Sequence, residues 1–403
     1  MRKDNEVVKH MEREAYRLSE AAERIDGQPM FKILSRIKEL EREGRHIVHF
    51  EIGDPDFNTP ENIVEAGKRA LDEGYTHYSD SMGDYDFRRL ICDNNFKSRG
   101  FVPDIDQVLV LPGANMMIYY AVRCLVNPGD EVIVQNPCFP TYLSVFNFCG
   151  VKPVFVPLRE EYGFALRLED LKRSVTEKTR LIIVNSPHNP TGAIISPKEL
   201  EAIGRFAIEN KIYLYCDEIY SRLNYGDIPF YSPSVLDECK EYTIVANGFS
   251  KAFAMTGWRL GTGIGPRDVM EKMGLLLQTT SSCVPSFIQR AGMEAISGSQ
   301  NPVRFMVDTY KKRRDLLVRG LNSIPKISCV NPAGAFYVFP NITQTGLGSK
   351  EFAFRILEEG GVGLCAGSDF GDCGEGFVRL CYANSEEDIT EGIRRIRQFV
   401  DRL

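Results

Sequence analysis

The sequence predicts an α/β protein whose larger domain holds a mostly parallel, mixed sheet flanked by helices. From about residue 105, short aliphatic runs alternate with longer stretches that repeat their apolar residues at helical spacing. The runs that we interpret as strands are Val108–Leu111, Glu131–Val134, Leu181–Val184 and Ile212–Tyr215. Strands that are apolar on both faces and separated by helices are typical of a sheet buried between helical layers. Such a sheet binds ligands in the loops beyond the carboxyl ends of its strands.

The length of the chain, 403 residues, favours two domains, because single hydrophobic cores stop growing at roughly 250–300 residues. Residues 1–25 are highly charged and are expected to form a solvated helix or an arm. Residues 26–60 are expected to contribute to a smaller domain, and Thr59 and Pro60 predict the start of a helix that the Thr59 hydroxyl caps. We expect the large domain over residues 61–295 and the smaller α+β domain over residues 296–403.

Charge and cysteine usage limit the classes of function. The net charge of −6 argues against non-specific binding to nucleic acid or to an anionic membrane surface. The eleven cysteines include no CxxC pair, and the chain neither begins with an apolar signal core nor contains a membrane-spanning run. The five histidines show no metal-ligand spacing, so no metal is expected. We therefore expect a cytoplasmic protein.

Three segments contain residue types that suit one kind of chemistry. In chain order they are Asn185–Gly192, Asp217–Tyr220 and Ser250–Gly261. The amine of Lys251 can form a Schiff base with an aldehyde cofactor, and Arg259, eight residues later, can clamp the phosphate of that cofactor. Taken alone, Lys251 fits a surface charge, Asp217 a helix cap and Asn189-Pro190 a turn. The case therefore depends on the three segments together.

In this order and at this spacing, the segments resemble the class I/II aminotransferases of the fold-type I pyridoxal-phosphate enzymes, such as the aspartate, alanine and aromatic aminotransferases. The resemblance runs from about Gln28 to the C-terminus. It implies pyridoxal 5'-phosphate as the cofactor and the fold-type I architecture. It also implies transfer of an amino group between an amino acid and a 2-oxo acid, and a homodimer with shared active sites.

The resemblance assigns the catalytic residues. Lys251 would hold the cofactor and later move a proton at the substrate, as a positioned general base. Asp217 would pair with the cofactor's ring nitrogen and keep that nitrogen protonated. Tyr220 and Asn189 match the positions that donate hydrogen bonds to its phenolic oxygen.

The phosphate would be held where the strand Val108–Leu111 meets the next helix. Small residues there let backbone amides approach an anion at a helix N-terminus. The residues implied at the phosphate are Gly113, Ala114, Asn115, Ser250 and Arg259, together with Tyr78 from a neighbouring subunit. Phe139 matches the position of an aromatic side chain that stacks on the cofactor ring.

For the substrate, Arg379 looks like the arginine that binds the α-carboxylate, assisted by Gly53 and Asn189. An arginine inside the apolar run Val378–Cys381 would be costly to bury unpaired, which favours this function. Asn115 stands where some aspartate-specific relatives carry a lysine, and the segment Met30-Phe31 is apolar. We therefore expect a neutral or apolar L-amino acid as one substrate and 2-oxoglutarate as the oxo acid.

Other functions remain open at this point. The closest alternative is a lyase or a decarboxylating deaminase on the same fold, because the cofactor performs the chemistry and the geometry of the site selects the bond. A transcription regulator on this fold would need an additional DNA-binding domain. The run Gly261–Gly265 superficially suggests a dinucleotide loop of a dehydrogenase, but Pro266 interrupts it and no suitable acid follows. We interpret it as a glycine-rich strand.

Overall fold

The computed structural model describes residues 18–25, 27 and 29–403. Most of the charged arm expected at residues 1–25 lies outside the described residues. Within them, α2 (Glu20–Glu23) is a single turn whose Ser19 hydroxyl accepts a hydrogen bond from the Ala22 amide. The Arg24 side chain donates to the Asn147 carbonyl at 3.0 Å, which attaches this turn to α7 (Pro140–Cys149).

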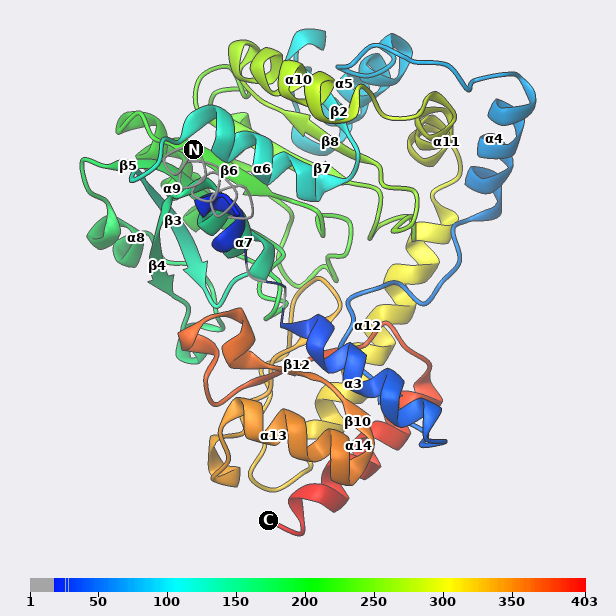
Figure 1. The fold of residues 1–403 in the computed structure, drawn as a ribbon, viewed down its shortest axis with the longest axis vertical. Coiled ribbons are helices and arrows are strands. Elements are labelled where there is room, and N and C mark those ends of the chain that lie inside the picture. The colour runs from blue at the N-terminus through cyan, green and yellow to red at the C-terminus, as the bar shows by residue number, and fades with distance from the viewer. Residues whose placement is uncertain (1–17, 26, 28) are drawn as a thin grey trace, which may run out of the picture.

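A seven-stranded sheet forms the centre of the larger part of the molecule (Figure 1). Its strands, in spatial order, are β2 (Val108–Leu111), β8 (Gly261–Ile264), β7 (Thr243–Gly248), β6 (Tyr213–Asp217), β5 (Thr179–Asn185), β3 (Glu131–Asn136) and β4 (Lys152–Pro157). Only β8 runs antiparallel to its neighbours, and the other pairs are parallel. The predicted mixed, mostly parallel sheet is therefore confirmed, and the glycine-rich run is a strand rather than a dinucleotide loop.

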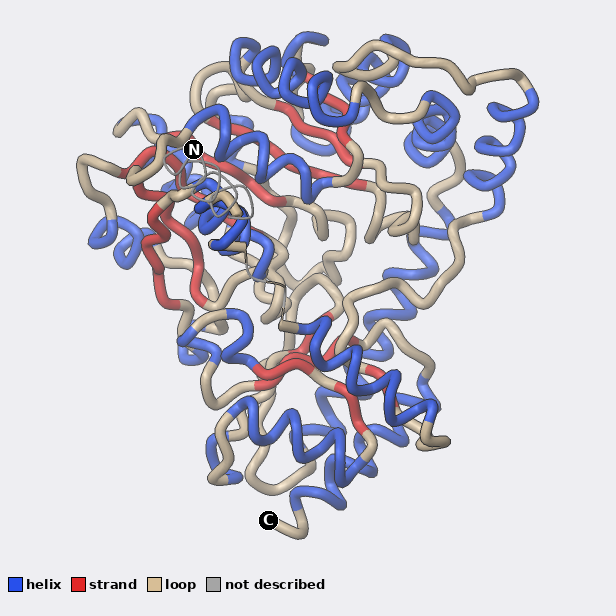
Figure 2. Tube along the Cα trace, viewed as in Figure 1, coloured by secondary structure: helices blue, strands red, loops and turns tan. Residues whose placement is uncertain are grey.

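Helices cover both faces of this sheet (Figure 2). Successive strand residues point to opposite faces, so Leu109 packs in one buried cluster and Val110 in the other. The helices on the Leu109 face are α6 (Ala114–Leu125), α7 and α10 (Arg267–Ser281). Those on the Val110 face include α4 (Glu61–Asp72), α5 (Tyr85–Arg99), α8 (Leu168–Ser174), α9 (Pro197–Glu209) and α11 (Ser286–Ser297).

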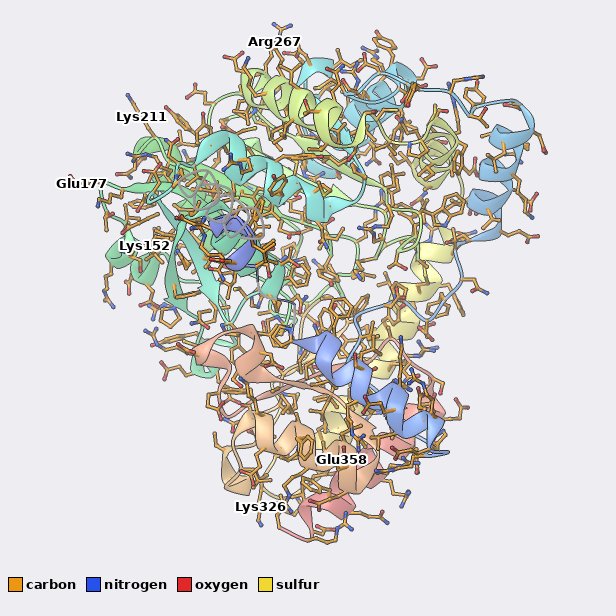
Figure 3. The ribbon with its side chains drawn as sticks, viewed as in Figure 1. Lys152, Glu177, Lys211, Arg267, Lys326 and Glu358 are labelled. Atoms are coloured by element: carbon orange, nitrogen blue, oxygen red, sulfur yellow. The ribbon has the colours of Figure 1, made fainter. Side chains whose placement is uncertain are left out.

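Charged side chains gather on the outside of these layers. Lys152, Glu177, Lys211 and Arg267 project from the larger part in Figure 3, away from the sheet. Among the described residues, no helix combines the length and the hydropathy needed to cross a membrane.

A second, smaller part holds two short sheets. One has the order β11 (Cys365–Ala366), β12 (Val378–Cys381), β9 (Tyr337–Val338), and the other pairs β1 (Val48–His49) in parallel with β10 (Val362–Gly363). The helices here are α3 (Met30–Arg42), α13 (Ser349–Arg355), the π-helical turn η5 (Ile356–Gly360) and α14 (Glu386–Val400). The long helix α12 (Asn301–Asn322) runs from one part to the other (Figure 1). The domain limits stay a prediction, which the pairing of β1 with β10 supports.

Short 3₁₀ helices complete the chain. They are η1 (Ile105–Gln107), η2 (Glu160–Tyr162), η3 (Pro233–Val235), η4 (Thr343–Thr345), η6 (Gly367–Phe370) and η7 (Asp372–Gly374). Helix α4 begins after Pro60, which makes no side-chain cap. The Thr59 hydroxyl instead donates to the Ala254 carbonyl at 2.6 Å and accepts from the Trp258 indole at 3.0 Å. The expected cap is therefore wrong, because a tertiary contact takes the hydroxyl.

Candidate active site

A cavity of about 240 Å³ opens at the carboxyl ends of β5, β6 and β7. Most of the predicted site residues line it: Gly53, Ala114, Asn115, Phe139, Asn189, Asp217, Tyr220, Ser250, Lys251, Arg259 and Arg379. Segments more than three hundred residues apart in the sequence, such as Gly53 and Arg379, meet here. The two predicted residues outside the lining are Gly113, which adjoins it, and Tyr78.

Lys251 lies in the turn that follows β7. Its ammonium donates to the Gly53 carbonyl at 2.5 Å and lies 5.7 Å from the centre of the Phe336 ring. The pKa of Lys251 is lowered to about 8, chiefly by burial; the charges of Arg379 and Arg259 contribute to this lowering, and Asp54 opposes it. The site therefore holds an amine that loses its proton more easily than an exposed lysine does.

Asp217 is the last residue of β6. The Tyr142 hydroxyl donates to its Oδ2 at 2.5 Å, and the Ile219 amide donates to its Oδ1 at 3.2 Å. Burial raises the pKa of Asp217, and these two hydrogen bonds act in the opposite direction. No cation among the described residues pairs with this carboxylate. Tyr142 was not predicted from the sequence, because only the tertiary packing of α7 brings its hydroxyl to Asp217. The one local signal is its spacing of three residues from Phe139.

Two loops fix the neighbouring amide and phenol groups. The backbone N–H of Asn189 donates to Asn185 Oδ1 at 2.9 Å, and Asn185 Nδ2 donates to the backbone carbonyl of Asp217 at 3.1 Å. The Tyr220 hydroxyl lies 2.7 Å from the Tyr337 hydroxyl. Asn185 and Tyr337 were not predicted, and Tyr337, in β9, has no sequence motif that marks it.

The tight packing of Tyr337 explains why residue 53 is glycine. A Cβ atom at Gly53 would lie 1.9 Å from the Tyr337 hydroxyl oxygen, which no side chain tolerates. The close approach leaves the Gly53 carbonyl free to accept from Lys251. The loop after β1 is thereby held against the catalytic turn.

Arg379 is buried in β12, with 1% of its surface exposed. One terminal nitrogen donates to Asn189 Oδ1 at 3.2 Å, and the other contacts the Glu51 carbonyl. Its Nε has no acceptor in the described part of the chain, and no carboxylate there pairs with it. Because buried charges are normally paired, this arrangement indicates a place for the carboxylate of a ligand.

An anion site forms where α6 begins. Gly113 is the N-cap of α6 with φ 89°, and the next residues, Ala114 and Asn115, line the cavity. A Cβ at Gly113 would lie 2.4 Å from a terminal nitrogen of Arg259, so glycine lets the guanidinium approach the backbone. The unpaired amides and the dipole of the helix favour an anion at this point, and Arg259 adds a positive charge.

Tyr78 is not brought to the cavity of its own chain. It is 88% exposed and lines a different surface hollow, with Asp80 and Ser286. The expectation that it serves the site of a neighbouring subunit stays a prediction. No group of His, Cys, Asp and Glu side chains suited to a metal ion occurs among the described residues.

The model of the aminotransferase class I and II family matches residues 45–396. The aspartate aminotransferase of Pyrococcus abyssi is 40% identical over 357 residues, which are 88% of this chain and 92% of that protein. The aromatic-amino-acid aminotransferase 2 of Thermococcus litoralis is 40% identical over 355 residues, which are 87% of this chain and 91% of that protein. The solved structure of Thermus thermophilus aspartate aminotransferase with maleate covers 95% of this chain and 99% of its own, with a TM-score of 0.91 and 34% identity.

These findings define a fold-type I pyridoxal-phosphate enzyme, and the chain belongs to the aminotransferase class I and II family. It is a pyridoxal-phosphate-dependent aminotransferase, and the lyase alternative is not favoured, since the relatives are aminotransferases by name. The residues of the cavity fit the cofactor. They offer a buried amine with a lowered pKa, a buried carboxylate that pairs with no cation of the described residues, and an arginine at a helix N-terminus.

Proposed function

We propose that the cavity residues divide the transfer of an amino group among three positions: Lys251 and Asp217 at the reacting centre, and Arg379 at the substrate carboxylate. When bound, pyridoxal 5'-phosphate supplies an aldehyde that accepts an amino group and a protonated ring that withdraws electrons from the substrate. The observation that carries the proposal is the occurrence, in one cavity, of an amine with a pKa of about 8 and a buried arginine that has no carboxylate partner in the described part of the chain.

Lys251 moves the proton. Its lowered pKa leaves part of the amine unprotonated near neutral pH, so it could take a proton from the substrate α-carbon and deliver it to the aldehyde carbon of the cofactor. Asp217 accepts a hydrogen bond from the ring nitrogen, and the Tyr142 hydroxyl holds the carboxylate in its orientation. Asn189 and Tyr220 face the same space and donate to the phenolic oxygen.

The phosphate takes the positive end of α6. The amides of Ala114 and Asn115, the Ser250 hydroxyl and the Arg259 guanidinium line this part of the cavity and would hold the phosphate. Phe139 lies on the cavity wall, with its ring 5.8 Å from that of Tyr142, where it packs against the cofactor ring.

The substrate is oriented by its α-carboxylate. Arg379 offers an unused Nε and terminal N–H groups for a two-pronged pair, and Asn189 lies beside it at 3.2 Å. Holding the carboxylate in this way would fix the orientation of the substrate α-carbon relative to Lys251. Gly53 borders the same position through the carbonyl that now accepts from Lys251.

The amino donor is a neutral or apolar L-amino acid. Phe31, Leu34, Ile52 and Ile118 line the cavity beyond the reacting groups, and Phe31 is 57% exposed. The cations in the described lining are Lys251, Arg259 and Arg379, each of which already has a role above. Asn115 offers an amide but no charge to a distal carboxylate, so aspartate gains less here than a donor that covers the apolar wall. The expected oxo acid is 2-oxoglutarate.

The working enzyme is a cytoplasmic homodimer with shared sites. The exposure of Tyr78 supports a role for this residue across a dimer interface. All eleven cysteines lie within the described residues and are free thiols, which suits a reducing compartment.

An absorbance experiment without any oxo acid tests this assignment. The purified holoenzyme is mixed with single amino acids, including leucine, phenylalanine, alanine and aspartate. We expect the colour of the bound cofactor to fade as pyridoxamine phosphate forms, fastest with the apolar donors. A fastest reaction with aspartate would overturn the substrate class, and turnover of an amino acid without pyridoxamine phosphate would overturn transamination.

A further inference from the structure

We propose that a second, smaller cavity binds one small monovalent inorganic anion, of the kind represented by chloride. It lies behind β7 and β8, on the face of the sheet opposite the active site, and its volume is about 60 Å³. Polar side chains in its wall are Asn94, Asn95, Arg99, Arg222, Asn247 and Thr262. A cavity of this size holds an anion together with a water molecule.

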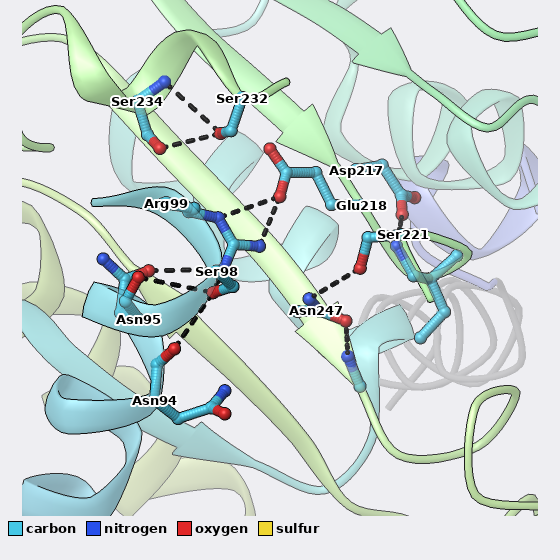
Figure 4. Close-up of polar contacts among 12 residues, drawn as sticks. Asn94, Asn95, Ser98, Arg99, Asp217, Glu218, Ser221, Ser232, Ser234 and Asn247 are labelled. Carbon is cyan, nitrogen blue, oxygen red and sulfur yellow. Dashed lines mark hydrogen bonds and ion pairs between the residues drawn. The ribbon is translucent and has the colours of Figure 1, made fainter. Parts of the chain in front are cut away.

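One of the two arginines is already neutralised. Arg99 Nε donates to Glu218 Oε2 at 3.0 Å, and a terminal nitrogen contacts the same oxygen (Figure 4). The two side chains are only 6% and 5% exposed. The remaining terminal nitrogen donates to Asn95 and Ser98. The pair of Arg99 and Glu218 therefore adds no net charge to the cavity.

Arg222 supplies an excess positive charge. It donates to Gln300 Oε1 at 2.9 Å, and its guanidinium lies 5.1 Å from the centre of the Phe253 ring. In the described part of the chain no carboxylate pairs with it, and burial together with the charge of Arg99 lowers its pKa. A partly buried cation without an anionic partner is unstable unless a counter-ion neutralises it. An anion in this cavity would face both guanidinium groups.

The remaining groups limit the charge of the ligand. Glu218 Oε1 is buried and has no hydrogen-bond donor among the described residues. Its negative charge, close to Arg99, disfavours a second negative charge nearby. One negative charge balances Arg222, whereas a divalent anion would leave an excess beside Glu218.

The position of this cavity links it to the strand ends that hold the active site. Asn247, Gly248 and Phe249 form part of its wall and directly precede Ser250 and Lys251. Glu218 directly follows Asp217. A bound anion would therefore stabilise the ends of β6 and β7 from behind, without touching the substrate.

Thermal unfolding of the holoenzyme in sodium chloride and in sodium gluconate at equal ionic strength tests the proposal. We expect chloride to raise the melting temperature of the parent by about 1–2 °C. Arg222→Met should abolish this difference and should melt in gluconate no lower than the parent, because it removes an uncompensated charge. The matched control is Arg205→Met, an exposed arginine paired with Glu201 on α9, which should keep the chloride effect.

Chloride can also bind near Arg379. Only the part of the chloride-dependent rise in melting temperature that is lost in Arg222→Met therefore reports on the proposed site. Broadening of the chloride NMR line by the parent, reduced in Arg222→Met, would show binding directly. Equal chloride shifts in the parent and in Arg222→Met would overturn the proposal as a general salt effect. If that variant does not fold, Arg222→Gln replaces it in both measurements. Absence of line broadening with the parent would overturn the proposal by itself.

Discussion

Two neighbouring acids at the end of β6 illustrate two different uses of a buried carboxylate. Asp217 and Glu218 follow one another in the chain and point to opposite faces of the sheet, as consecutive strand residues do (Figure 4). Asp217 faces the large cavity, where a phenol and a backbone amide donate to it and no cation of the described residues pairs with it. Glu218 faces the other side and is clamped by Arg99.

The presence or absence of an oppositely charged partner distinguishes a buried charge that stabilises the fold from one that is available to a ligand. A charge with an opposite partner stabilises the native packing, and its loss leaves the partner buried and unpaired. A charge without such a partner is a cost to the fold unless a ligand neutralises it. By this criterion Asp217 belongs with Lys251 and Arg379, and Glu218 belongs with the paired arginines Arg313 and Arg314.

The largest effect on activity is expected for Lys251→Ala. It removes both the group that holds the cofactor and the base that moves the proton, so turnover should fall by at least about 10⁴-fold. The melting temperature should stay the same or rise, because a buried amine is lost. Single-turnover kinetics and calorimetry on the same preparation check both effects. Wild-type turnover in this variant would contradict the mechanism.

Asp217→Asn should come next. Loss of the charge beside the ring nitrogen should lower kcat by about 10²–10³-fold, whereas Ser250→Ala, which removes one hydrogen bond to the phosphate, should cost about tenfold or less. Both variants should remain folded. Steady-state kinetics at saturating cofactor compare them directly, and similar losses would count against the role of Asp217.

Glu218→Gln should have the opposite effects to Asp217→Asn: a large loss of stability and little loss of activity. It leaves Arg99 buried without its carboxylate, so the free energy of unfolding should fall by about 3–5 kcal/mol, with turnover of the folded enzyme close to that of the parent. Combining it with Arg99→Met should restore part of the stability. Denaturant unfolding of the single and double variants measures the coupling. An activity loss as large as that of Asp217→Asn would break the distinction between the two acids.

The smallest effect concerns His49, which does not line the cavity. Its ring nitrogens lie 2.9 Å from Glu51 and 3.0 Å from Glu41, and the hydrogen bond to Glu51 is the main reason that its pKa rises to about 9. Because the folded pKa lies above the unfolded value of about 6.5, the stabilisation is complete below pH 6.5 and disappears as the pH rises through 9.

His49→Gln removes this contribution and gives the measurement. The parent should melt about 1–2 °C higher than the variant at pH 6, and the gap should close by pH 9.5, a modest effect because the ring is partly exposed. A gap that is the same at both pH values would show that the imidazole packs here without acting through its charge.

The amino-acid sequence was enough to predict the class of fold, five of the seven strands of the large sheet and many of the residues that line the active-site cavity, whereas β4 and β7 were not predicted. This was possible because the apolar runs of a buried parallel sheet are continuous, and because Asp217 ends one predicted strand while Asn189 lies in the loop that follows another. The loops that follow parallel strands lie at the same edge of the sheet, the edge formed by the carboxyl ends. The positions of these residues after their strands therefore indicate that their side chains meet there.

The hydrogen-bond and ion-pair partners of these side chains depend on tertiary packing. Tyr142 reaches Asp217 from α7, Tyr337 reaches Tyr220 from β9, and Arg99 reaches Glu218 across 119 positions of sequence. The Thr59 hydroxyl, which locally suits a helix cap, bonds to the loop that follows Lys251. Such contacts depend on how whole elements pack against one another. The sequence shows which groups are available, but only packing sets which of them remain unpaired and free to bind a ligand.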